Sequence, residues 1–310
     1  MIRQKAVLPI LLAAGMLAGC ASTPSTGGGD EYGVFYEGES EATYSTAFPV
    51  SSPEEAYRNG DSAAQTGDYD RALYEYIRGL RLEEAPPTEV LYKIGSIHHA
   101  RENYRLASLA YRWALEIEPN HAAAGTGLGV LYLEARQYEA AKAQLEPVVN
   151  ATEAAPWRAY NALGILADMD GDPVSAEQYY QQALTANPRS PQILNNLGYS
   201  RYLVGDWVGA RNALQQALNA DAGYELAWRN LGLVHAREKN YRSALEALGR
   251  TGEESEAYND VGYVSMMSGD YAQALAFFNK AMHLSPAYYV TASENARNAE
   301  RMMQRGPAIQ

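Results

Sequence analysis

A pattern of small residues recurs along most of this sequence with a period of about 34 positions. Seven glycines between Gly60 and Gly262 are separated by 35, 34, 35, 34, 34 and 30 residues, and an alanine follows each glycine after twelve residues. The glycines are Gly60, Gly95, Gly129, Gly164, Gly198, Gly232 and Gly262, and the alanines are Ala72, Ala107, Ala141, Ala176, Ala210, Ala244 and Ala274. A fixed period of this length is typical of a solenoid, in which each unit buries its apolar face against its neighbours.

Each unit contains two segments with the spacing of an amphipathic helix. In the fifth unit, residues 191–224, apolar residues and the repeat glycine lie at helical spacing on one face, and Gly205 with Asp206 predicts a turn before the second helix. Glycine inside a helix costs about 1 kcal/mol relative to alanine. We therefore expect the second helix to pack closely against Gly198, so that the closer packing offsets this cost.

This pattern resembles the tetratricopeptide repeat, whose 34 residues form two antiparallel helices. The resemblance implies an all-α fold: a right-handed superhelical solenoid of seven helix pairs in residues 53–288. Residues 289–310 are predicted to form a polar capping helix and a tail. The sixth unit is four residues short, which predicts that its second helix is truncated.

The N-terminal sequence MIRQKAVLPILLAAGMLAGC has a positive start, an apolar run and the chain's single cysteine, Cys20. The apolar run is shorter than the roughly 20 residues that span a bilayer. The sequence before Cys20 resembles a bacterial lipobox, although an ordinary signal peptide with an incidental cysteine is the alternative. The lipobox implies that residues 1–19 are a lipoprotein signal peptide and that Cys20 carries acyl chains such as palmitate. Ala21, where an aspartate would favour the inner membrane, implies the periplasmic face of the outer membrane.

Residues 20–52 are predicted to be a tether between the lipidated cysteine and the repeats. Its first part, ASTPSTGGGD, is rich in Gly, Ser and Thr, which favours a flexible chain. Its later part, EYGVFYEGESEATYSTAF, carries five aromatic residues among acids. These aromatic residues either pack against the folded body or form a short binding segment.

Composition and motifs argue against several classes of function. The net charge of −12 repels phosphate backbones, so we expect no nucleic-acid partner. Adjacent residues on a helix point about 100° apart, so His98 and His99 are not expected to share a metal ion. The segment GTGLG at 125–129 has no preceding strand and no Lys-Ser/Thr ending, so it does not indicate a nucleotide site. We expect no catalytic residues, no metal and no cofactor.

A binding surface is predicted on the first helices of the units. With the repeat glycine counted as position eight, positions two, five, nine, twelve and thirteen face the concave side. In units four to seven these positions hold amides, tyrosines and methionines where an ordinary surface carries Glu and Lys. The predicted partner-binding residues are Asn161, Asp168, Asn195, Tyr199, Tyr202, Arg229, Leu233, Asn259, Tyr263 and Met266. The alternative is that these residues only fill the inner curve. Asn196, one position round toward the rim, is expected to be solvated or locally paired.

The C-terminal half, residues 190–300, resembles the TadD-type lipoproteins of tight-adherence (Flp) pilus systems. The resemblance is carried by NNLGYSRYLVGDWVGARNALQQALNADAGYELAWRNLGLVHAREKNYRSALEAL and, after the short unit, by AYNDVGYVSMMSGDYAQALAFFNKAMHLSPAYYVTASENARN. It implies a non-catalytic scaffold whose protein partners are secretin or pilus assembly components. A type IV pilus pilotin, an NlpI-like adaptor for cell-wall hydrolases, and an enzyme hidden in the solenoid remain alternatives.

Overall fold

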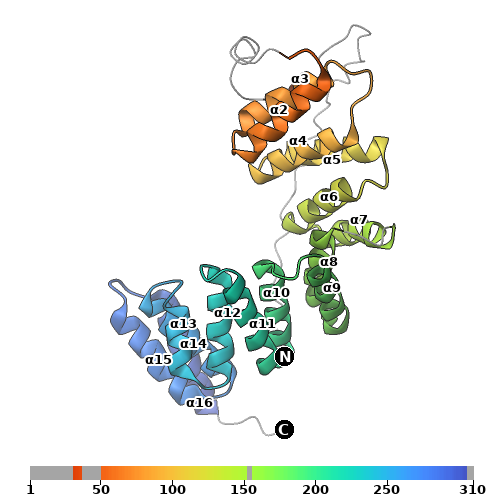
Figure 1. Cartoon of the computed structure of the whole chain (residues 1–310). Helices are drawn as coiled ribbons and strands as arrows, with labels where there is room; N and C mark the ends of the chain where they lie inside the picture. Colours follow the sequence, from red (N-terminus) through yellow and green to blue (C-terminus); the bar gives the residue numbers. More distant parts are fainter. Residues whose placement is uncertain (1–30, 37–49, 152–155, 306–310) are drawn as a thin grey trace, which may run out of the picture.

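A computed structural model describes residues 31–36, 50–151 and 156–305 (Figure 1). Every regular element in these ranges is a helix. They are η1 (Gly33–Phe35), α2 (Pro53–Gln65), α3 (Tyr69–Leu80), α4 (Thr88–Ala100), α5 (Tyr104–Ile117), α6 (Ala122–Glu134), α7 (Tyr138–Ala151), α8 (Trp157–Asp170), α9 (Pro173–Ala186), α10 (Pro191–Leu203), α11 (Trp207–Ala220), α12 (Glu225–Arg237), α13 (Tyr241–Leu248), α14 (Glu254–Met267), α15 (Tyr271–Leu284) and α16 (Val290–Arg305). The predicted signal peptide, Cys20 and most of the predicted tether lie outside the described residues.

The helices α2 to α15 form seven antiparallel pairs that follow one another along a curved stack (Figure 1). The even-numbered helix of each pair is called the first helix below, and the odd-numbered helix is the second. Each pair packs on the next, and the final helix α16 packs on the last pair. The predicted all-α solenoid of helix pairs with a C-terminal helix is therefore confirmed.

The turn inside each pair has a residue in the left-handed conformation. Glycine occupies it in four repeats, as at Gly205 with φ of +84°. In the second, third and sixth repeats the residue is Glu102, Arg136 or Lys239, with φ between 58° and 60°. An aspartate often follows and caps the second helix, as where Asp206 accepts a hydrogen bond from the backbone N–H of Gly209 at 2.9 Å. These turns fix the antiparallel pairing of the two helices.

The repeat glycine marks the point where the two helices of a pair come closest. A Cβ atom at Gly198 would lie 2.7 Å from Cγ of Leu214, and one at Gly164 would lie 2.6 Å from the ring of Tyr180. Even alanine would overlap the facing helix at these positions, and overpacking of this kind costs about 1–3 kcal/mol. The close approach therefore explains the period that the sequence shows.

Two predicted features of the C-terminal end are observed. The second helix of the sixth repeat, α13, has 8 residues, whereas α11 and α15 each have 14. Helix α16 buries a row of alanines, Ala292, Ala296 and Ala299, against the last pair. No described helix combines the length and the apolar character that crossing a membrane requires.

The segment 31–36 packs onto the first two repeats, which favours the first of the two alternatives given above for its aromatic residues. Phe35 is fully buried and Tyr32 is 7% exposed. Tyr32 stacks on Trp113 of α5 with ring centroids 5.2 Å apart, and Tyr36 contacts Tyr74 of α3 at 5.8 Å. The other two aromatic residues of the predicted tether, Tyr44 and Phe48, lie outside the described residues.

Candidate functional site

The first helices of repeats two to five surround a hollow of about 500 Å³ on their shared face. Position five, nine or twelve of the first helix supplies most of its wall, as the helical spacing predicts. The lining residues at these positions are Tyr92, Ser96 and His99 from α4, Thr126, Val130 and Leu133 from α6, and Asn161 and Ile165 from α8. Arg158 and Gln192, both at position two, extend the wall toward α10. The hollow therefore lies nearer the N-terminus than the predicted binding surface of repeats four to seven.

Small residues create this hollow. Position six of the first helix is Gly127 in repeat three and Ala162 in repeat four. A Cβ atom at Gly127 would lie 2.6 Å from Cζ of Tyr111, so the glycine lets this ring from α5 reach between α4 and α6. The Tyr111 ring stacks with Tyr92 at 6.1 Å and becomes part of the wall. An apolar, aromatic floor results where a larger residue would have closed the gap.

Charged groups lie at the edge of the hollow. Nε2 of His99 lies 2.9 Å from a carboxylate oxygen of Glu134, which joins α4 to α6. The exposed guanidinium of Arg158 lies 4.7 Å from the centroid of the Trp157 ring. Aromatic walls with a few polar groups at the rim are typical of surfaces that bind protein segments. The site can hold an apolar side chain and orient the chain around it.

The three asparagines predicted to line an open groove are buried instead. Asn161, Asn195 and Asn259 are 5%, 4% and 7% exposed. Each lies at position five and accepts a hydrogen bond from an asparagine of the next even-numbered helix. The bonds run from Asn196 to Asn161 at 3.0 Å, from Asn230 to Asn195 at 2.9 Å, and from Asn295 to Asn259 at 3.0 Å. We call these three bonds the amide ladder.

The amide ladder corrects the prediction that these side chains are exposed, and its cause is physical. A buried amide costs several kcal/mol unless it is hydrogen-bonded, and neighbouring first helices place positions five and six of successive repeats opposite each other. Between repeats six and seven an ion pair takes this place, with 3.8 Å between Arg229 and Asp260. Burial raises the pKa of Asp260, while the charge of Arg229 opposes the rise. Asn196, expected to be solvated or locally paired, pairs with both Asn161 and Asn195.

Met266 and Asp168 are also more enclosed than predicted. Met266 is 7% exposed and packs in the core with Phe278, whereas its neighbour Met267 is 56% exposed. Asp168 accepts hydrogen bonds from the Tyr180 hydroxyl at 2.9 Å and the Ser200 hydroxyl at 2.6 Å. Burial raises the pKa of Asp168 against the effect of these bonds. Asp168 therefore joins repeats four and five, and Met266 joins the last repeat to α16.

The other predicted contact residues remain accessible. Tyr199 and Tyr263 are 40% and 48% exposed, Arg229 is exposed, and Leu233 is half-buried. Tyr199 stacks on Tyr202 with ring centroids 5.9 Å apart and an interplanar angle of 17°. These residues could take part in recognition on the C-terminal repeats, and their role stays a prediction.

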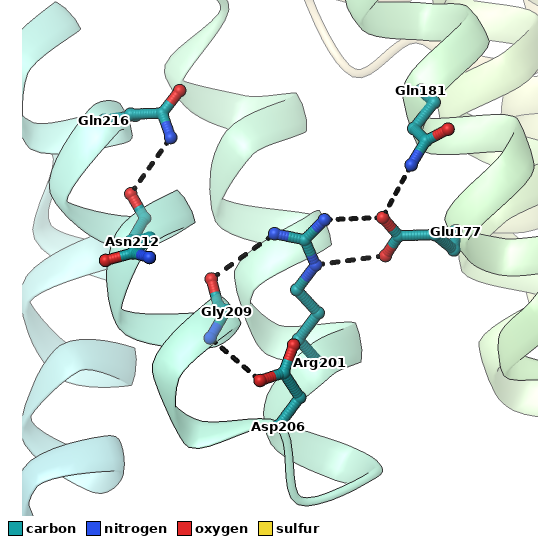
Figure 2. A network of polar contacts seen from close by, with 7 residues as sticks. All are labelled: Glu177, Gln181, Arg201, Asp206, Gly209, Asn212 and Gln216. Atoms are coloured by element: carbon teal, nitrogen blue, oxygen red, sulfur yellow. Dashed lines mark hydrogen bonds and ion pairs between the residues drawn. The ribbon is translucent and has the colours of Figure 1, made fainter.

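A further link between repeats four and five lies around Arg201 of α10 (Figure 2). Its guanidinium donates to both carboxylate oxygens of Glu177 on α9, at 3.1 Å and 2.5 Å, and lies 3.5 Å from the carbonyl oxygen of Gly209 on α11. Gln181 donates to the same carboxylate at 2.8 Å. Burial alone would raise the pKa of Glu177, but the hydrogen bonds from Arg201 and Gln181 lower it below its usual value.

The sequence contained the signal for the hollow. Tyr92, Val130 and Leu133 occupy the same positions that were used to select residues in repeats four to seven. Helical spacing in repeats two and three therefore predicts that these side chains face the concave side. The role of Gly127 could not be predicted from the sequence, because it depends on the Tyr111 ring of α5 packing against this glycine. Among the described residues, no three metal-ligating side chains come together.

Comparison with known families gives matches along most of the repeat region. Two sequence profiles described as tetratricopeptide repeat match this chain. One matches residues 126–191 and 195–254, and the other matches residues 88–121 and 255–288. These ranges contain α4 and α8 and most of α6 and α10, the first helices that line the hollow.

Curated relatives match a short part of the chain. The photosystem I assembly protein Ycf3 of Rippkaea orientalis is 34% identical over 92 residues, which cover 29% of this chain and 51% of the relative. Ycf3 of Cyanophora paradoxa is 37% identical over 78 residues, covering 24% of this chain and 45% of the relative. The chain thus spans about half the length of these relatives.

Several solved structures share the fold. A tetratricopeptide repeat protein from Parabacteroides merdae aligns with a TM-score of 0.54 and 17% identity, over 80% of this chain and 98% of that one. PilF of Pseudomonas aeruginosa aligns with a TM-score of 0.53 and 18% identity, over 68% of this chain and 97% of that one. PilW, described as a type IV pilus biogenesis factor, aligns with a TM-score of 0.55 and 14% identity, over 67% and 97%.

Proposed function

Because the chain belongs to the tetratricopeptide-repeat family, whose members are non-catalytic scaffolds for protein interaction, we propose that it captures a protein partner in the hollow of repeats two to five. The observation that carries this proposal is the 500 Å³ space with aromatic and aliphatic walls. A space of this size holds several side chains of a protein segment. Its apolar floor supplies affinity, and the charged rim at Glu134 and Arg158 supplies orientation.

We further propose that the partners are components of a pilus or secretin assembly. The resemblance of residues 190–300 to TadD-type proteins supports this, and PilF and PilW have the same fold. Ycf3 is likewise named as an assembly protein. The pilotin role and the adaptor role for cell-wall hydrolases are the alternatives, and the identity of the captured partner separates them.

We also propose that the chain is anchored to the periplasmic face of the outer membrane through acyl chains on Cys20. The order of positive start, apolar run and single cysteine supports this proposal. Several acyl chains bind stably where one is marginal, since each buried methylene contributes about 0.8 kcal/mol. Cys20→Ala should remove lipid labelling and release the protein from the membrane fraction. A lipid-labelled Cys20→Ala product would contradict the anchoring.

The hollow is tested by photo-crosslinking in cell envelopes. A photoreactive residue at position 130, inside the hollow, should crosslink a partner, and the matched probe at position 109, on the exposed side of α5, should not. Trp157→Ala should weaken the crosslink at position 130. Equal crosslinking at both positions would contradict the hollow as the binding site. Capture of a secretin or pilus component supports the assembly role, and capture of a cell-wall hydrolase replaces it with the adaptor role.

A further inference from the structure

Residues 31–36, which we call the docked segment, are held on the solenoid by a buried hydrogen bond and by aromatic stacking. Its short 3₁₀ helix is closed by the bond from the backbone N–H of Tyr36 to the carbonyl oxygen of Gly33. The carbonyl oxygen of Phe35 lies 3.0 Å from Nε2 of the buried His98. A carbonyl can only accept, so this nitrogen of His98 donates. A buried histidine on α4 is thus oriented toward the backbone of the segment.

Aromatic contacts also hold the docked segment. The Trp113 ring of α5 stacks on Tyr32 at 5.2 Å and on Phe35 at 6.1 Å. Burial in this site, together with a hydrogen bond and charge from Glu31 and the charge of Glu83, raises the pKa of Tyr32 to about 12. Val34, between the two buried rings, is 42% exposed. The segment therefore docks through its aromatic side chains and the Phe35 carbonyl, against α3, α4 and α5.

Helix α4 separates this site from the hollow. His98 faces the docked segment, and the adjacent His99 lines the hollow. Successive residues on a helix point about 100° apart, so the two histidines address different sides of α4. The docked segment and the hollow therefore lie on different sides of α4.

We propose that residues 31–36 are the attachment point of the anchored N-terminus, so that the α3 and α5 side of the solenoid faces the bilayer and the hollow faces the periplasm. This inference rests on the anchoring proposed above. Ten residues, 21–30, separate Cys20 from the docked segment, and at 3.3–3.6 Å per residue they reach at most about 35 Å. Without docking, the 32 residues before Pro53 would reach at most about 110 Å. The docked segment thus sets both the distance from the membrane and the face presented to it.

The test compares two insertions in the full chain. Twenty Gly/Ser residues are inserted either after residue 30 or after residue 43, and the lipidated protein is reconstituted in vesicles of phosphatidylethanolamine and phosphatidylglycerol with a fluorescent acceptor lipid. A donor dye is placed by an encoded azide residue at position 109, which is 41% exposed and lies one turn before Trp113 on α5. Energy transfer from the dye to the lipid reports how close α5 lies to the membrane.

The proposal expects the insertion after residue 30 to cause a loss of energy transfer and the insertion after residue 43 to leave it unchanged. With Tyr32→Ser and Phe35→Ser together, both insertions should cause the loss. Val34→Ser is the matched control, because this side chain is exposed within the same turn, and it should behave as the unmodified chain. Equal loss from both insertions in a chain with an intact docked segment would overturn the proposal, and this comparison needs no destabilising substitution.

The two proposals fail in different ways. If the full chain is absent from the membrane fraction, the natural anchoring is contradicted. The insertion comparison is then run with a maleimide lipid coupled to Cys20, the chain's single cysteine. In that setting unequal effects of the two insertions still support the docked segment as the attachment point, and equal effects still overturn it.

Discussion

The two halves of the solenoid use the same helix positions for opposite purposes. From repeat four to repeat six, asparagines at positions five and six hydrogen-bond from one first helix to the next, and the ion pair between Arg229 and Asp260 follows between repeats six and seven. In repeats three and four, position six is Gly127 or Ala162, and a hollow opens at this level of the stack. Asn161 belongs to both regions, because it lines the hollow and accepts the first bond of the amide ladder. The choice of side chain at position six therefore determines whether the concave face is filled or open.

This comparison separates stability from recognition. A buried amide that loses its partner costs about 1–3 kcal/mol, so the amide ladder makes the C-terminal repeats dependent on one another. Among the described residues no pair of amides joins the helices across the hollow, where the contact of His99 with Glu134 lies at the rim and much of the wall is apolar side chains that a partner can cover. We therefore expect substitutions in the ladder to affect unfolding and substitutions in the hollow to affect partner capture.

The largest effect is expected for Asn195→Ala. This change removes the buried Asn195 amide and leaves the half-buried amide of Asn230 without its acceptor, so the free energy of unfolding should fall by about 2 kcal/mol. Urea unfolding followed by circular dichroism measures it. Asn212→Ala on α11 is the matched control, because that side chain is exposed, and it should change the free energy by less than about 0.5 kcal/mol. If Asn195→Ala leaves unfolding unchanged but abolishes capture at position 130, the division between ladder and hollow is wrong.

A bond can also be introduced where the hollow lies. Thr126 and Ala162 occupy positions five and six of successive first helices, so Thr126→Asn with Ala162→Asn recreates the pair found at Asn195 and Asn230. Each single variant buries an unpaired amide and should be destabilised by about 1–3 kcal/mol. The double variant should recover roughly 1 kcal/mol of coupling, as measured by a double-mutant cycle.

The same double variant tests recognition. A pair of asparagines between α6 and α8 would occupy part of the hollow, so crosslinking of the partner at position 130 should be lost. The variant Leu109→Asn, on the exposed side of α5, is the control for added amide groups and should retain crosslinking. Full crosslinking by a folded double variant would show that the partner does not enter this part of the hollow.

The sequence predicted the fold better than the site, for a physical reason. The period of Gly60 to Gly262 reflects contacts within one helix pair, and such local contacts are visible in a single sequence. Whether Asn195 is exposed depends on Asn230, 35 residues away, and on the distance between two first helices. Helical spacing cannot tell an open face from one closed by a neighbouring repeat. Met266 shows the same limit, since the core around it includes Phe278 and α16.

The smallest effect is expected from acid, through the ion pair between Glu177 and Arg201. The pKa of Glu177 in the folded protein is lower than in the unfolded chain. The stability from this pair is therefore fully present above the unfolded pKa, about 4.3, and is lost as the pH falls through the lower folded value. Because the pair is partly exposed, we expect a loss of no more than about 1 kcal/mol.

Urea unfolding between pH 3 and pH 7 measures this acid loss. Glu177→Gln should have a shallower acid slope than the unmodified chain, because its amide does not titrate. The control is Glu139→Gln on α7, an exposed carboxyl outside the links between repeats four and five, which should leave the slope unchanged. Asp168 and Asp260 act in the opposite direction, since burial raises their pKa and favours the protonated form in the folded chain. Identical slopes for Glu177→Gln and the unmodified chain would mean that the pair between Glu177 and Arg201 contributes nothing measurable to stability.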